Sequence, residues 1–207
     1  MYVIVAKEKN KKMPSRETLY QCFSKNPHDC GFMYAVKNHV YIKKGFMDFD
    51  LFYNRITKLD KQIDLTKNAI IMHFRISTSG KIDEENCHPY PITSNLRDTR
   101  STFLKCDDIA FCHNGIIKEY VPNRNSLYND TQIFGAKVLS VFKKMYPIFY
   151  KGKNIIKILN ILCKSKLCFL DNKGNIYYVG KFFKHDEIIY SNLNFLHGKD
   201  VPNYYNE

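Results

Sequence analysis

Apolar residues along the chain fall into short blocks whose spacing predicts alternating strands and helices. Consecutive apolar residues at 2–6 predict a buried strand at the start of the chain. Apolar residues three and four apart predict a helix capped by Ser15 and another over residues 49–59. Further strands are expected at 31–35, 39–43, 69–75, 108–113, 166–170, 175–180 and 188–191, and further helices at 131–145 and 154–162.

The order of these elements favours an α+β fold in which helices cover an antiparallel sheet system. The chain has 207 residues, which suffice for one domain with a hydrophobic core. Hydrophobic residues make up 44% and aromatic residues 14%, values typical of globular proteins. Neither an internal repeat nor a low-complexity linker interrupts the pattern, so we expect a single domain over residues 1–207.

The formal net charge is +12, which raises the question of an anionic partner. The lysines are scattered, and the densest runs, at 7–12, 143–144 and 151–157, are short. No basic block is joined to a pattern of stacking aromatic residues, so nucleic acid is only weakly supported as a partner. A solvated basic surface is the simpler interpretation.

The seven cysteines form no CxxC pair, so we expect reduced thiols and no metal site. The sequence has no apolar run long enough for a membrane span and no signal segment at its start. These features predict a cytoplasmic protein with no membrane partner.

Two segments in the first half of the chain could bind a ligand. Residues 73–80 run from an apolar strand into a loop that ends in glycine, and Arg75 there suits a carboxylate. An ordinary surface ion pair is the alternative role for this arginine. Residues 86–92 form a proline-containing turn around His88, which by itself indicates only an ordered loop.

Two further segments follow in the second half. Asn114-Gly115 comes directly after a predicted strand, and the two residues offer a side-chain amide and a backbone N–H close together. Such a pair suits an oxyanion hole, although Asn-Gly is also a common turn. Asp130 lies at a helix start, where it could hold an ammonium group or cap the helix.

Together and in this order, the four segments resemble the motifs of the class II glutamine amidotransferases, the cysteine branch of the N-terminal-nucleophile hydrolases. That family carries a histidine–any–arginine loop with Thr and Gly, an Asn-x-His-Pro turn, a His-Asn-Gly segment and a Ser-Asp-Thr-Glu segment. The corresponding segments here are HFRISTSG, NCHPY, HNG and NDTQ. The likeness covers nearly the whole chain and extends to a compact, stand-alone type associated with bacteriophage genomes.

The resemblance implies a four-layer αββα sandwich of two antiparallel sheets, with a pocket for glutamine. It implies that Arg75, assisted by Thr78, grips the α-carboxylate of glutamine. It also implies that Asp130 pairs with the α-ammonium group. For a viral protein, the location would be the cytoplasm of the host cell.

The same resemblance assigns the other site residues. Asn114 and the backbone N–H of Gly115 would form the oxyanion hole. His88 and His113 would lie behind the substrate-binding groups and fix their loops. Neither a cofactor nor a metal is implied, and a separate protein that accepts ammonia is conceivable as a partner.

One departure from the family pattern concerns the nucleophile. In the family, removal of the initiator Met leaves a cysteine whose thiol attacks while the freed α-amine acts as general base. Here position 2 is Tyr2, and its bulky phenol does not replace a thiolate. Because Met removal generally requires a small second residue, we expect Met1 to stay, which also withholds the amine.

A relocated thiol is one way to restore a nucleophile. Cys30, Cys87 and Cys112 lie near the motif segments. Strand alternation directs the side chain of Cys112 away from that of His113. A thiol without an adjacent amine needs a histidine base, and the sequence singles out none.

Three hypotheses follow from the sequence. The leading one is an amidotransferase-like pseudo-enzyme that keeps a pocket for glutamine or a related small ligand. The second is an active amidohydrolase with a non-standard nucleophile. The third is a phage host-interaction or nucleic-acid-binding module that uses the basic surface.

Overall fold

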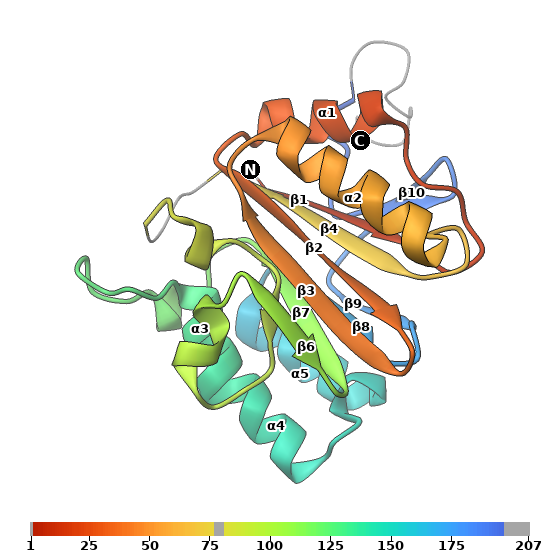
Figure 1. Ribbon diagram of the computed structural model, residues 1–207. Helices are drawn as coiled ribbons and strands as arrows, with labels where there is room; N and C mark the ends of the chain where they lie inside the picture. The colour runs from red at the N-terminus through yellow and green to blue at the C-terminus, as the bar shows by residue number, and fades with distance from the viewer. Residues whose placement is uncertain (1, 77–80, 197–207) are drawn as a thin grey trace.

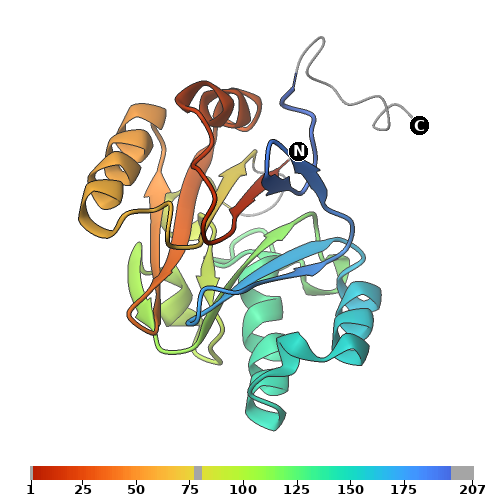
Figure 2. The same cartoon turned by 90° about the vertical axis from the view of Figure 1, so that its right-hand side faces the viewer.

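The protein folds into four layers, seen from two directions in Figures 1 and 2. The computed structural model describes residues 2–76 and 81–196. A seven-stranded sheet faces a four-stranded sheet, and helices cover the outer face of each. All strand pairs are antiparallel. The expected α+β sandwich of the N-terminal-nucleophile hydrolase type is therefore confirmed.

The two sheets join segments that are far apart in the sequence. The larger sheet has the order β10-β11-β1-β4-β2-β3-β6, and the smaller has the order β5-β7-β8-β9. The larger sheet consists of β1 (Val3–Lys7), β2 (Asp29–Val36), β3 (His39–Phe46), β4 (Ile70–Arg75), β6 (Phe103–Cys106), β10 (Phe183–His185) and β11 (Ile188–Tyr190). The smaller consists of β5 (Tyr90–Pro91), β7 (Ile109–Asn114), β8 (Lys166–Asp171) and β9 (Ile176–Val179).

Two capped helices cover the larger sheet. Helix α1 (Arg16–Lys25) begins after Ser15, whose hydroxyl accepts the backbone N–H of Thr18 as the sequence predicts for a cap. Helix α2 (Phe49–Ile63) begins after Asp48, which caps it in the same way. The apolar stripe of α2 packs on the sheet, because its residues recur three and four positions apart.

The helical layer on the smaller sheet contains α3 (Asp130–Phe134), α4 (Ser140–Met145) and α5 (Lys153–Cys163). The sequence predicts one helix over 131–145, but a π-helical turn at Gly135–Leu139 separates α3 from α4. A Cβ atom on Gly135 would lie 2.8 Å from the Phe111 ring, so this turn packs tightly on β7. Short 3-10 turns lie at Glu84–Asn86, Leu96–Arg100, Lys118–Tyr120 and Phe149–Lys151.

Strand β1 shows why the layers form. Its side chains alternate between faces, as the pleat requires. Val3 and Val5 pack in the cluster under α1 and α2, whereas Ile4 and Ala6 pack between the sheets. A third cluster fills the space between the smaller sheet and its helices.

The short strands β5, β6 and β10 were not predicted. Each contains two to four residues, too few for an alternation pattern, and β10 and β6 lie at the edges of the larger sheet. Among the described residues, no helix combines the length and the apolar character needed to cross a membrane.

Candidate functional site

Tyr2 and Asn114 meet at the start of β1. The Asn114 side-chain Nδ2 donates to the backbone carbonyl of Tyr2 at 2.9 Å, across 112 positions of sequence. Asn192 Nδ2 donates to the same carbonyl at 2.7 Å. Asn114 Nδ2 also donates to the Ser191 hydroxyl at 2.8 Å, so both of its amide hydrogens are engaged. The structure thus joins the predicted oxyanion residue to position 2.

The side chain of Tyr2 is packed inside the protein. Only 8% of Tyr2 is exposed, and its ring centroid lies 5.9 Å from that of His73. The His73 ring stacks on His88 at 4.2 Å, and His88 contacts Tyr90 at 4.7 Å. An aromatic row therefore leads from position 2 into the space beside β5.

Gly115 follows Asn114 in a backbone conformation that favours glycine. Its φ angle is +140°, and a Cβ atom there would lie 2.7 Å from the Cβ of Ser165. The Ser165 hydroxyl contacts His113 Nε2 at 2.6 Å, and His113 Nδ1 contacts the Thr131 hydroxyl at 2.9 Å. Burial lowers the pKa of His113 to about 3, so the ring is neutral at pH 7. Two hydroxyl contacts therefore fix the strand end that precedes the Asn114-Gly115 turn.

Arg75 ends β4 and forms an ion pair with Asp29 at the start of β2. Nη1 of Arg75 donates to Oδ2 of Asp29 at 2.8 Å, and the two side chains are 1% and 0% exposed. Burial raises the pKa of Asp29, and the Arg75 charge opposes that shift. The alternative role of Arg75 in a surface ion pair is wrong, because Arg75 forms an ion pair that is buried.

Asp130 is the first residue of α3 and is 5% exposed. Its Oδ2 accepts the backbone N–H of Ile117 at 2.7 Å. Asn129 caps the helix and forms a capping box with Gln132, so the alternative role of Asp130 as the cap is wrong. Burial raises the pKa of Asp130, and backbone N–H groups oppose that shift.

Two predicted site residues remain, Thr78 and His88. Thr78 lies outside the described residues. His88 is 4% exposed, and neither of its ring nitrogens has a hydrogen-bond partner among the described residues. Burial lowers the pKa of His88 well below its usual value. His88 is thus a buried neutral ring.

Electrostatic interactions indicate that the predicted residues lie near one another. Burial lowers the pKa of Arg75, but Asp29, Tyr90 and Tyr2 raise it by more. Arg75 is in turn among the groups that lower the pKa of Asp130. Arg75 therefore lies within electrostatic reach of both Tyr2 and Asp130.

The comparisons with known proteins agree with this arrangement. The family model of the class-II glutamine amidotransferases matches residues 50–132, and a search of curated proteins found no match. The match supports the glutamine amidotransferase family. It includes Arg75, Asn114 and Asp130 and covers less than half of the chain, without position 2.

The three cysteines near the amidotransferase motifs are poor candidates for a relocated nucleophile. Cys30, Cys87 and Cys112 are each 0% exposed. Burial raises the pKa of Cys30 and Cys87 well above its usual value, which disfavours the thiolate. Cys112 packs between the sheets, on the face of β7 opposite to His113, as strand alternation predicts.

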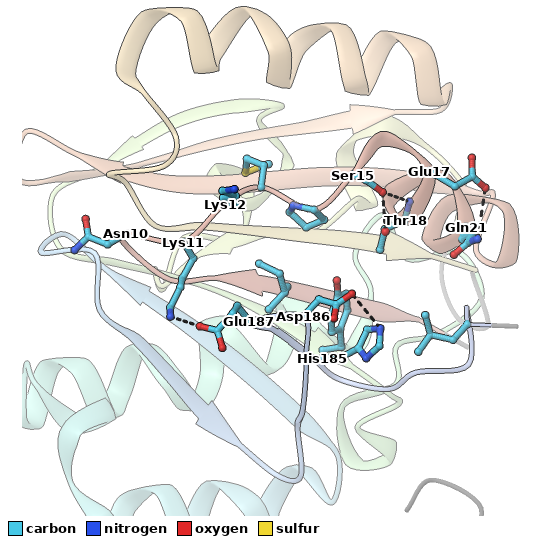
Figure 3. Close-up of a pocket in the computed structure, with 15 residues that line it drawn as sticks. Asn10, Lys11, Lys12, Ser15, Glu17, Thr18, Gln21, His185, Asp186 and Glu187 are labelled. Carbon is cyan, nitrogen blue, oxygen red and sulfur yellow. Dashed lines mark hydrogen bonds and ion pairs between the residues drawn. The ribbon is translucent and has the colours of Figure 1, made fainter. Parts of the chain in front are cut away.

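Two cavities differ in their relation to the amidotransferase residues. One of about 900 Å³ lies beyond the other end of β1, beside α1 and the β10–β11 hairpin (Figure 3). Two pairs of its charged groups lie close together, Lys11 with Glu187 and His185 with Asp186, and none of the predicted site residues lines it. A cavity of about 340 Å³ is lined by Lys81, whose carbonyl Arg75 contacts, and by Tyr128 near the start of α3.

Sequence reasoning missed four residues that hold the predicted site residues in place. Asp29 pairs with Arg75, Asn192 and Ser191 hold position 2 and Asn114, and Ser165 holds His113. None belongs to a motif, and each acts on a residue from a distant segment. Among the described residues, no group of three potential metal ligands converges.

Proposed function

We propose that the chain is a class II glutamine amidotransferase-like domain of the compact bacteriophage type, which binds glutamine or a related amino acid without ordinary glutaminase turnover. The main observation in favour of this proposal is the hydrogen bond from Asn114 to the carbonyl of Tyr2. It supports residue 2 as the nucleophile position, because residue 2 contacts the expected oxyanion residue. That position holds a phenol, which is far less reactive than a thiolate.

The charges near position 2 suit an amino acid. Arg75 provides a cation for an α-carboxylate, and Asp130 provides an anion for an α-ammonium group. The Asp29 pair supports this role because it fixes the orientation of the Arg75 guanidinium. A neighbouring cavity of about 340 Å³ falls in the range of small-molecule sites.

Glutamine hydrolysis and glutamine binding test the proposal separately. We expect no ammonia release by the wild-type chain. We expect calorimetry to detect glutamine binding, with an affinity that Asp130→Asn lowers at least tenfold. Tyr2→Cys, prepared with Cys as the first residue, should release ammonia. The same variant with Met1 retained is the matched control, since it has the thiol without the free amine.

Each result bears on a different hypothesis. Turnover by the wild-type chain would favour an amidohydrolase with a non-standard nucleophile, and Tyr2→Phe would then show whether the phenol takes part. Absence of glutamine binding would contradict the proposed pocket. Salt-sensitive binding of nucleic acid in its place would favour the basic-surface hypothesis.

A further inference from the structure

Helix α5 carries apolar side chains on its exposed surface as well as on its buried face. Leu159 and Cys163 are buried in the cluster beneath the smaller sheet. On the outer face, Ile158 is 44% exposed, Ile161 69% and Leu162 42%. A surface helix ordinarily has a polar outer face, so these three residues form an unusual apolar strip.

A row of lysines runs beside this strip. Lys153, Lys157 and Lys164 are exposed. Lys153 and Lys157 lie one helical turn apart, on the line that also holds Ile161, and Lys164 is the C-cap residue that follows the helix. None of the three takes part in an ion pair within the described part of the chain. We call these three lysines together with Ile158, Ile161 and Leu162 the α5 surface.

The surrounding sequence has no acidic residue to balance the α5 surface. Residues 131–170 contain eight lysines and neither Asp, Glu nor Arg, so they account for +8 of the net +12. This uniform charge disfavours pairing of the surface with a second copy of itself. The positive charge favours an anionic partner, and the apolar strip favours a partner that also removes it from water.

We propose that the α5 surface docks on an anionic phospholipid bilayer. The isoleucines and the leucine would enter the headgroup region, and the lysines would contact lipid phosphates. Nucleic acid fits the lysines but leaves the apolar strip in water. A specific protein partner buries about 800 Å² on each side, far more than the outer face of a helix about 16 Å long provides.

This docking is independent of the amidotransferase site and involves no membrane span. The sequence excluded a membrane partner because no segment is long enough to cross a bilayer. Attachment to the bilayer surface needs only one helix face.

Flotation of the full-length protein with vesicles tests the proposal. We expect it to float with vesicles of phosphatidylcholine and phosphatidylglycerol and not with phosphatidylcholine alone. Lys157→Glu removes a positive charge and adds a negative one, so it should lower the partition about twenty-five-fold, because each charge near the surface contributes roughly fivefold. Ile161→Ser should lower it about tenfold.

Matched variants on α2 provide the controls. Leu51 is 64% exposed and Lys58 is exposed, so Leu51→Ser and Lys58→Glu repeat the same changes on the opposite helical layer. These variants should float like the wild-type protein, with circular dichroism confirming that all four variants are folded. The proposal would be overturned if the protein floated with neither vesicle or equally with both. It would also be overturned if the controls lost as much flotation, or if the protein bound duplex DNA in place of anionic vesicles.

Discussion

The buried pair of Arg75 and Asp29 should contribute far more to stability than an exposed pair of the same chemistry. Asp29→Asn keeps the side-chain size but removes the charge, leaving the Arg75 guanidinium buried at 1% exposure without its carboxylate. Loss of one partner of such a pair destabilises a protein by about 3 kcal/mol or more. The exposed pair of Arg16 and Asp50 has a similar distance, 2.7 Å against 2.8 Å, with side chains 53% and 71% exposed. Asp50→Asn should therefore lower the unfolding free energy by about 1 kcal/mol at most.

Urea denaturation of both variants measures this difference. With a slope of about 3 kcal/mol per molar urea, Asp29→Asn should lower the midpoint by roughly 1 M. Asp50→Asn should shift it by roughly a third of that or less. Equal shifts for the two variants would refute the reasoning, because burial is the main difference between the two pairs.

Two further predictions concern buried histidines and the turn at Gly115. Burial lowers the pKa of His73 and of His113 to about 3 in the folded protein, so as the pH falls these rings take up protons in the unfolded chain before they do so in the folded one. The free energy of unfolding should therefore fall below pH 6.5 by about 1.4 kcal/mol per pH unit for each histidine. Urea unfolding at pH 7.5 and 5.5 measures this loss of stability. His113→Gln should remove the part of the loss that His113 causes, and equal stability at the two pH values would contradict the burial argument. Gly115→Ala should destabilise the protein by about 2 kcal/mol or more because φ is +140° and Ser165 is 2.7 Å from the added Cβ. Gly152→Ala is the control, with φ at −76° and its nearest neighbour at 3.4 Å, and a loss as large as that of Gly115→Ala would show that strain is not the cause.

The sequence predicted the central elements because their side chains repeat with a regular period. Strand β4 lies between β1 and β2, as its largely apolar run predicts for a buried strand. Lys37 and Asn38 lie between the predicted strands 31–35 and 39–43, and in the structure they form the turn that joins β2 and β3, both with positive φ angles. Register and sheet order depend on contacts between distant segments, which no local pattern records.

The site was predictable only in part, for the same reason. The ordered motifs predict Arg75, Asn114 and Asp130 as site residues, and in the structure Arg75 interacts electrostatically with both Tyr2 and Asp130. The partner of Arg75 could not be predicted, because Asp29 lies 46 positions away and meets it only through the pairing of β2 with β4. Asn129 rather than Asp130 caps α3 because the cap is the residue before the first helical one.

The π-helical turn at Gly135–Leu139 has a consequence for variation in chain length. A π turn accommodates one residue more than an α turn while the helix on either side keeps its facing. A relative one residue shorter here would form a continuous α-helix and still present the same faces of α3 and α4 to the smaller sheet. A one-residue change in length at this turn therefore need not displace Asp130, which the capping box holds at the other end of α3.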